Sequence, residues 1–84
     1  MTRFYFHLRS GDEITLDDEG AEFPNYSAAL SEARLAAREL LAEAVRAGRL
    51  YFPDNFVIAD ALGKELGTFP LATLLPRPSE SKPA

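Results

Sequence analysis

The first part of the chain alternates between apolar and polar residues, which is the pattern of a strand with one buried face. In segment 3–9, one side carries Phe4, Phe6 and Leu8, and the other carries Tyr5, His7 and Arg9. The turn residues Ser10-Gly11-Asp12 follow, and segment 13–17 resumes the alternation. Opposed residues of a hairpin share a face, so apolar positions should pair with apolar ones. This favours a three-residue loop, with Leu8 opposite Ile14 and Phe6 opposite Leu16.

The middle of the chain changes to a period of 3.6 residues and predicts a long amphipathic helix. Asn25 suits the N-cap, and Gly48 suits the left-handed position after the last turn. The expected apolar stripe consists of Tyr26, Leu30, Ala33, Ala37, Leu40, Leu41, Ala44 and Val45. The far side carries Glu32, Glu39, Glu43 and Arg46. The predicted helix would be about 34 Å long, whereas a strand would span only about 20 Å. One end of the helix should therefore extend beyond the sheet as an overhang. We therefore expect segment 50–52 to cover part of the overhang.

Two more alternating segments predict strands over 55–60 and 64–69, joined by Ala61-Leu62-Gly63. The predicted fold is α+β with element order ββαββ. It has a four-stranded antiparallel sheet in the order 2-1-3-4, with the long helix on one face. We expect a single domain over residues 1–75, which ends in a short turn of helix over 71–75. The Pro- and Ser-rich segment 76–84 is predicted to be a disordered tail.

The predicted second hairpin leaves several small and apolar residues on the sheet face away from the helix. With their neighbours on the first strand, the candidate interaction residues are Tyr5, His7, Val57, Ala59, Gly67 and Phe69. An exposed apolar patch of this kind indicates an interaction site. We therefore expect contact with a second copy, as a homodimer, or with another protein. The alternative is that segment 71–75 folds back and covers the patch.

The composition restricts the possible partners and compartments. The 84 residues carry a net charge of −4 and include no cysteine, which removes disulfides and thiolate-bound metals. Acidic charge argues against nucleic acid and favours a basic protein partner. The longest apolar run, segment 56–59, is far too short to cross a membrane. The N-terminus lacks the apolar region of a signal peptide. We expect a cytoplasmic protein.

The candidate catalytic groups are few. His7 is the single histidine, so no histidine pair is present for zinc or for a proton relay. A contact between His7 and Asp17 would suit general-base catalysis or recognition, but a solvated histidine beside a carboxylate is the simpler interpretation. The acidic segment 12–22 fails the calcium-loop template, which needs carboxylates where Thr15 and Tyr26 stand. No nucleophile or phosphate-binding motif is present. We therefore expect no enzymatic activity, cofactor or metal.

Several short motifs follow one another along the chain: Phe4-Tyr5-Phe6-His7, Gly11-Asp12, Asp17-x-x-Gly20, Pro24, an Ala-rich helix with Glu32-Ala33, and Ile58-x-Asp60-x-x-Gly63. This string resembles a family of small bacterial proteins catalogued as a domain of unknown function. The resemblance covers most of residues 3–75. It implies a bacterial origin and a single domain, and it implies no activity.

A looser resemblance is to HicB-type antitoxins, and it rests on Asp18-Glu19-Gly20, Pro24 and the Ala- and Glu-rich segment 28–44. This resemblance implies an acidic partner that neutralises a basic protein. A third possibility is a domain that binds a small ligand under the overhang of the helix.

Overall fold

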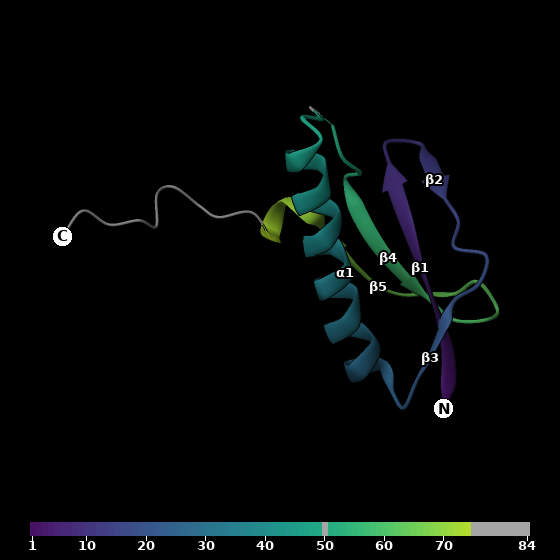
Figure 1. Ribbon diagram of the computed structural model, residues 1–84. Helices are drawn as coiled ribbons and strands as arrows, with labels where there is room; N and C mark the ends of the chain where they lie inside the picture. Colours follow the sequence, from purple (N-terminus) through teal and green to yellow (C-terminus); the bar gives the residue numbers. More distant parts are fainter. Residues whose placement is uncertain (50, 75–84) are drawn as a thin grey trace.

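In the computed structural model, which describes residues 1–49 and 51–74, one helix lies against one face of an antiparallel sheet (Figure 1). The elements are β1 (Thr2–Ser10), β2 (Glu13–Thr15), β3 (Ala21–Phe23), α1 (Tyr26–Arg46), β4 (Asn55–Ala59), β5 (Glu65–Pro70) and the 3₁₀ helix η1 (Leu71–Leu74). The sheet order is β2-β1-β4-β5, and β3 also pairs with β1. The α+β class is confirmed, whereas the prediction of four strands was wrong. The predicted tail, 76–84, lies outside the described residues.

β3 is the strand that the prediction missed. It pairs with the beginning of β1, from Thr2 to Phe4, while β2 pairs with the end of β1, from Leu8 to Ser10. The two short strands thus lie end to end along one edge of β1 (Figure 1). β3 has three residues, too few for a periodic pattern to reveal. In the labels of the structure, the predicted order 2-1-3-4 corresponds to β2-β1-β4-β5, so it omitted β3.

The first hairpin has a two-residue loop, so the predicted three-residue loop was wrong. Leu8 pairs with Thr15, and Arg9 pairs with Ile14. Gly11 has a φ of 59° and takes the first central position of the loop, where a type II′ turn favours glycine. Because a shift of one residue changes the face of every side chain in a strand, Ile14 lies on the face away from α1.

The second hairpin contains a register shift between Ile58 and Ala59 that the prediction lacked. Beyond the shift, Phe56 pairs with Phe69 and Ile58 pairs with Gly67. The rings of Phe56 and Phe69 stack with centroids 5.3 Å apart. At Gly67, the absent side chain leaves room for the hydroxyl group of Tyr26. Gly67 and Phe69 therefore face the helix, and their predicted place on the opposite face was wrong.

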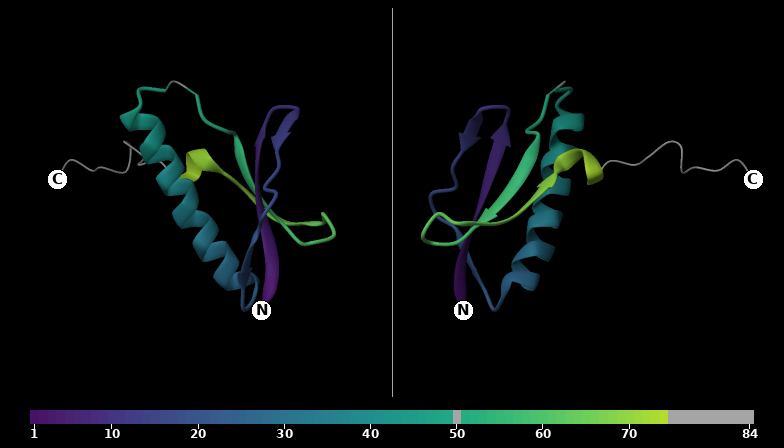
Figure 2. Two further views of the ribbon diagram at one scale, coloured as in Figure 1. Left: turned by 45° about the vertical axis from the view of Figure 1, so that its right-hand side comes forward. Right: turned by 180° about the vertical axis from the view of Figure 1, so that it is seen from behind.

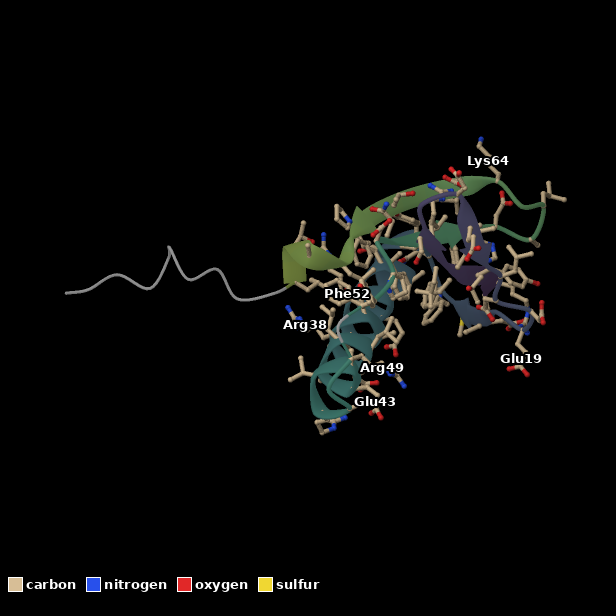
Figure 3. All side chains as sticks on the ribbon, turned by 90° about the horizontal axis from the view of Figure 1, so that it is seen from above. Glu19, Arg38, Glu43, Arg49, Phe52 and Lys64 are labelled. Atoms are coloured by element: carbon tan, nitrogen blue, oxygen red, sulfur yellow. The ribbon has the colours of Figure 1, made fainter. Side chains whose placement is uncertain are left out.

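The hydrophobic core lies between α1 and the sheet. Its buried members are Phe4, Ala29, Ala33, Ala37, Leu41, Phe56, Ile58 and Leu71. The alanines allow the helix backbone to approach the aromatic side chains of the sheet closely. Arg38 and Glu43 point away from the sheet (Figure 3). Val45 is 72% exposed, so the predicted apolar stripe was wrong at that position.

Both ends of α1 carry the predicted caps. The side chain of Asn25 accepts a hydrogen bond of 2.9 Å from the N–H group of Ala28. At the other end Gly48 has a φ of 71°, and the N–H group of Arg49 donates to the carbonyl group of Ala44 at 2.8 Å. This is the Schellman arrangement.

The chain after the helix covers the core only in part. Phe52 packs against it, whereas Tyr51 is 84% exposed, so the expected cover by Tyr51 was wrong. Leu50 lies outside the described residues.

The segment after β5 turns toward the helix. Leu71 is fully buried, and its N–H group donates to the carbonyl group of Asp54 at 3.0 Å. The two views of Figure 2 show η1 beside the C-terminal half of α1. η1 is the predicted turn of helix, but it does not cover the face of the sheet opposite α1. No helix in residues 1–49 and 51–74 is long and apolar enough to cross a membrane.

Candidate binding site on the open face of the sheet

The sheet face opposite α1, called the open face below, carries Tyr5 and His7 of β1. Tyr5 pairs with Ala59 of β4, and His7 pairs with Val57. Four of the six predicted interaction residues therefore share this face. However, Val57 is 0% exposed and Ala59 is 1% exposed. The prediction that they form an exposed apolar patch was wrong, because side chains of this chain already cover them.

An ion pair explains part of this burial. Arg9 of β1 lies opposite Asn55, and Glu65 of β5 lies opposite Ala59. The guanidinium group of Arg9 donates to the carboxylate of Glu65. A contact between these two side chains must pass over β4 between Asn55 and Ala59, at the level of Val57. The open face is therefore polar where the sequence predicted an apolar surface.

The loop between β2 and β3 is held to β1 by one carboxylate. Asp17 accepts hydrogen bonds from the N–H groups of Glu19 and Gly20, both at 3.1 Å, which closes a tight turn. Its second carboxylate oxygen accepts a 3.1 Å hydrogen bond from the N–H group of Phe6 in β1. Phe6 lies between the stretches of β1 that pair with β2 and β3. The Asp17 side chain thus accepts the hydrogen bond of an N–H group at the point on this edge of β1 where neither β2 nor β3 pairs with it.

These hydrogen bonds determine the charge state of Asp17. Partial burial acts to raise the pKa of its carboxyl group, but the N–H groups of Phe6, Gly20 and Glu19 together with the charge of His7 outweigh this effect. The net result is a pKa below the usual value of 3.8. Asp17 therefore remains a carboxylate throughout the neutral and mildly acidic range.

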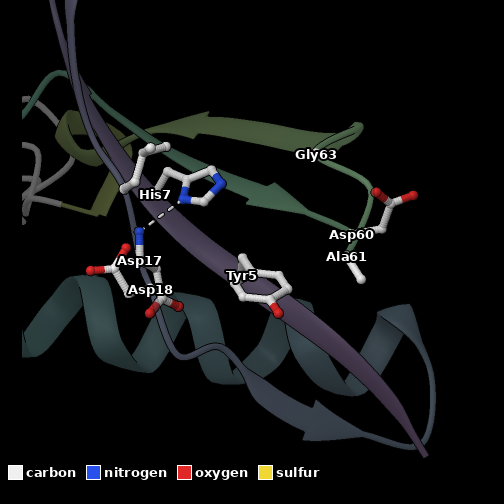
Figure 4. Close-up of a pocket in the computed structure, with 8 residues that line it drawn as sticks. Tyr5, His7, Asp17, Asp18, Asp60, Ala61 and Gly63 are labelled. Atoms are coloured by element: carbon white, nitrogen blue, oxygen red, sulfur yellow. Dashed lines mark hydrogen bonds between the residues drawn. The ribbon is translucent and has the colours of Figure 1, made fainter.

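His7 is bound to the backbone of the same loop. Its Nδ1 atom accepts a hydrogen bond of 3.0 Å from the N–H group of Asp17 (Figure 4). Acceptance at Nδ1 places the proton of the neutral ring on Nε2. The carboxylate of Asp17 is occupied by backbone N–H groups instead of by the imidazole ring. The predicted proximity of His7 and Asp17 is confirmed, but it does not create a carboxylate–imidazole pair.

Gly20 allows this loop to lie close to β1. It has a φ of 68°, and a Cβ atom there would lie 2.8 Å from the carbonyl oxygen of Phe4 and 2.9 Å from the ring of Tyr5. Only glycine fits both the backbone conformation and this spacing. The motif Asp17-x-x-Gly20 is therefore a structural unit that fixes the loop beside Tyr5 and His7.

A second Asp-x-x-Gly turn joins β4 to β5. One carboxylate oxygen of Asp60, Oδ1, accepts hydrogen bonds from the N–H groups of Leu62 and Lys64, both at 2.9 Å. The N–H group of Asp60 donates to the carbonyl group of Lys64 at 2.9 Å. Because Ala59 pairs with Tyr5, this turn follows β4 directly beside the beginning of β1.

The two turns enclose a shallow pocket of about 370 Å³ on the open face. Tyr5 and His7 lie between Asp17 and Asp18 on one side and the turn of Asp60 on the other (Figure 4). The lining residues are Tyr5, His7, Leu16, Asp17, Asp18, Asp60, Ala61 and Gly63. Sequence reasoning identified Tyr5 and His7 and connected Asp17 with His7, but it did not connect the other five lining residues with them. The two Asp-x-x-Gly motifs were the available signal, but placing them together requires the pairing of β1 with β4.

The donors at this pocket do not form a metal centre. In the part of the chain that the structure describes, no group of three or more histidine, aspartate or glutamate side chains is arranged to hold a metal ion. The pocket instead offers hydrogen-bonding and aromatic groups. Tyr5 Oη, His7 Nε2, Asp60 Oδ2 and the carboxylate of Asp18 have no hydrogen-bond partner among residues 1–49 and 51–74.

The fold and the site together define a small α+β domain whose sheet carries a pocket between two Asp-x-x-Gly turns. The chain belongs to the family described as Domain of unknown function (DUF6894), which it matches over residues 3–72. Neither the comparison with curated proteins nor that with solved structures gives a match. The motifs of the family resemblance lie inside the matched range, and three of them contribute Tyr5, His7, Asp17, Asp60 and Gly63 to the lining of the pocket.

Proposed function

We propose that this chain is a non-catalytic protein-interaction domain that docks a partner on the open face, with the pocket at the centre of the contact. The observation that carries the proposal is the contrast in hydrogen bonding around the pocket. The carboxylate of Asp17 and one oxygen of Asp60 accept hydrogen bonds from backbone N–H groups, which hold these two side chains in the walls of the pocket. Tyr5 Oη, His7 Nε2 and Asp60 Oδ2, without partners in the described part of the chain, remain for a ligand.

The arrangement of His7 supports the non-catalytic part of the proposal. A general base needs a ring nitrogen that is oriented by a second group and directed at a proton of the substrate. The backbone holds His7 through Nδ1, and no carboxylate in residues 1–49 and 51–74 accepts a hydrogen bond from Nε2. The ring is thus positioned by the loop, but within the described residues no hydrogen bond from Nε2 to a carboxylate activates it. Recognition by hydrogen bonding needs no such activation.

Charge favours a different protein over a second copy as the partner. A homodimer was predicted from an apolar patch, and Val57 and Ala59 of that patch are buried within one chain. Two copies that met through their pockets would bring the carboxylates of Asp18 and Asp60 toward their equivalents. Each chain also carries a net charge of −4. Repulsion of like charges opposes that contact, whereas a basic surface would be attracted.

A basic partner is also what the HicB-type resemblance implies, and the acidic lining of the pocket favours such a partner independently of that resemblance. The third possibility, a small ligand under the helix overhang, places the site on the other side of the molecule. Such a ligand would therefore use a site separate from the pocket on the open face.

The proposal is tested by photo-crosslinking in the cells from which the gene derives. A benzoylphenylalanine replaces Leu16, which is 61% exposed and lines the pocket. A matched variant carries the same group at the exposed Glu39 on the far side of α1. We expect defined adducts from position 16 that are absent from position 39. Equal adducts from both positions, or none from position 16, would exclude docking on the open face.

A further inference from the structure

We propose that the pocket binds a cationic side chain of the partner protein, with an arginine guanidinium group preferred. This inference rests on the proposed function and specifies the chemistry that the open face recognises.

Charge is the first observation. Three of the eight lining residues are aspartates, Asp17, Asp18 and Asp60, and none is lysine or arginine. Hydrogen bonds from the backbone keep the pKa of Asp17 below its usual value, so this charge persists when a ligand approaches. Asp18 and one oxygen of Asp60 retain acceptor capacity in the described structure. The pocket therefore attracts a cation and repels phosphates and carboxylates.

Shape is the second and independent observation. A volume of about 370 Å³ lies at the lower end of the range for ligand pockets, roughly 300–1,000 Å³. It suits one long side chain. The wall opposite Asp17 and Asp18 is made of the small residues Ala61 and Gly63, which leave this space open. An isolated group of acidic residues on a convex loop would not provide such a cavity.

Aromatic groups are the third observation, and they favour arginine over lysine. The rings of Tyr5 and His7 have centroids 6.4 Å apart and planes inclined by 27°, so they form a nearly parallel pair. A planar guanidinium group stacks on an aromatic ring and donates to carboxylates in its own plane at the same time. An ammonium group is a compact point charge with stronger hydration, and it gains less from such a surface.

The test uses the full chain labelled with ¹⁵N and three small probes: N-acetylarginine amide, N-acetylcitrulline amide and N-acetyllysine amide. Citrulline is the neutral isostere of arginine and is the matched control. We expect the arginine probe to shift the backbone amide signals of Tyr5, His7, Ala61 and Gly63 in a saturable manner at millimolar concentrations. The lysine probe should bind more weakly. The citrulline probe should leave these signals unchanged.

Two variants locate the binding in the pocket. Asp18→Asn removes a charge from a carboxylate that has no partner in the described structure, and it should weaken arginine binding about two- to fivefold. Ala61→Phe fills the cavity from an exposed turn position and should abolish the shifts. Glu39→Gln removes the same charge from the far side of α1 and should leave the affinity unchanged. The unchanged amide spectrum outside the pocket reports that each variant is folded.

Three results would overturn the inference: equal shifts with citrulline and arginine, equal losses with Asp18→Asn and Glu39→Gln, or arginine binding that survives Ala61→Phe. The first denies charge recognition, the second indicates diffuse attraction by the acidic surface, and the third places the contact elsewhere. The crosslinking experiment is independent of all three. Adducts at position 16 without arginine binding would therefore contradict this inference and still support docking of a partner on the open face.

Discussion

The side chain of Asp17 accepts a hydrogen bond from β1 that a neighbouring strand would otherwise accept. Between the stretches of β1 that pair with β2 and β3, the N–H group of Phe6 would point to solvent, and the carboxylate accepts it instead. The same carboxylate closes the turn through Glu19 and Gly20. Hydrogen bonds to a charged acceptor are stronger than those between neutral groups. One residue thus connects the loop, the strand and the wall of the pocket.

The first prediction follows from these hydrogen bonds. Asp17→Ala should lower the free energy of unfolding at neutral pH by about 1–3 kcal/mol, because three backbone N–H groups lose a charged acceptor. Asp18→Ala, at an exposed neighbour, should change it by less than about 0.5 kcal/mol. Urea denaturation followed by circular dichroism measures both. Equal effects of the two variants would contradict the role assigned to Asp17.

The pH dependence provides a second prediction at this residue. The pKa of Asp17 is lower in the folded chain than its ordinary value of 3.8. The stabilisation is therefore fully present above the unfolded pKa and is lost as the pH falls through the folded pKa. We expect the difference in unfolding free energy between the wild type and Asp17→Ala to be constant from neutral pH down to about pH 5 and to shrink below about pH 4. A difference that does not change with pH would show that the charge of Asp17 is irrelevant.

Gly20 supports a third prediction, with Gly11 as its control. Both have positive φ, 68° and 59°, so alanine is strained at either position. That strain costs about 1–2 kcal/mol. At Gly11 a Cβ atom would meet nothing within 4 Å, whereas at Gly20 it would press on Phe4 and Tyr5. Gly20→Ala should therefore lower the free energy of unfolding clearly more than Gly11→Ala does. Thermal unfolding of the two variants measures the difference, and equal losses would mean that the loop does not pack on β1.

At the scale of single residues, the sequence predicts features that depend on near neighbours. Asn25 and Gly48 act within a few residues of themselves, and both were placed correctly. The partners of Asp17 are different, because Phe6 and His7 are about ten residues away and meet it only when the register of β1 is known. Such contacts require the three-dimensional arrangement first.

Among the elements, α1 gives the clearest prediction. Leu41 is 5% exposed in the core, while Val45, one turn later, is 72% exposed. Leu41→Ala should therefore lower the free energy of unfolding by about 2–5 kcal/mol. Val45→Ala should change it by less than about 0.5 kcal/mol, since no buried contact is lost. Chemical denaturation of both variants checks the phase of the helix. A large loss at Val45 would show that the last turn packs against the core after all.

The two hairpins show why strand register was harder to predict than strand existence. Alternation alone predicted that Ile14 and Leu16 face the core. The turn formed by Gly11 determined the register instead, and it left both side chains on the open face. In the second hairpin the stacking of Phe69 on Phe56 accompanies a register shift that no periodic pattern contains. Turn geometry and aromatic packing therefore outweighed simple alternation.

At the scale of the whole molecule, burial and connectivity were enough to predict the α+β class and the neighbouring places of β1 and β4 in the sheet. The two most apolar strands, β1 and β4, lie side by side, because their side chains are the ones that need cover. The candidate site could be predicted only in part. Tyr5 and His7 follow from alternation, but the pocket also needs Asp60 and Ala61, which the pairing of β1 with β4 brings across the sheet.

The open face supports the last prediction, because it contains both a buried apolar residue, Val57, and an exposed one, Leu16. Val57 is 0% exposed within a single chain, so Val57→Asp would bury an unpaired carboxylate and should unfold much of this small domain. Leu16 is 61% exposed, so Leu16→Asp should leave the circular dichroism spectrum unchanged. Sedimentation equilibrium then tests self-association separately. Because the pocket is acidic, we expect a monomer at high micromolar concentration for both the wild type and Leu16→Asp. A wild-type dimer that Leu16→Asp dissociates would instead identify the open face as a contact between copies of this chain.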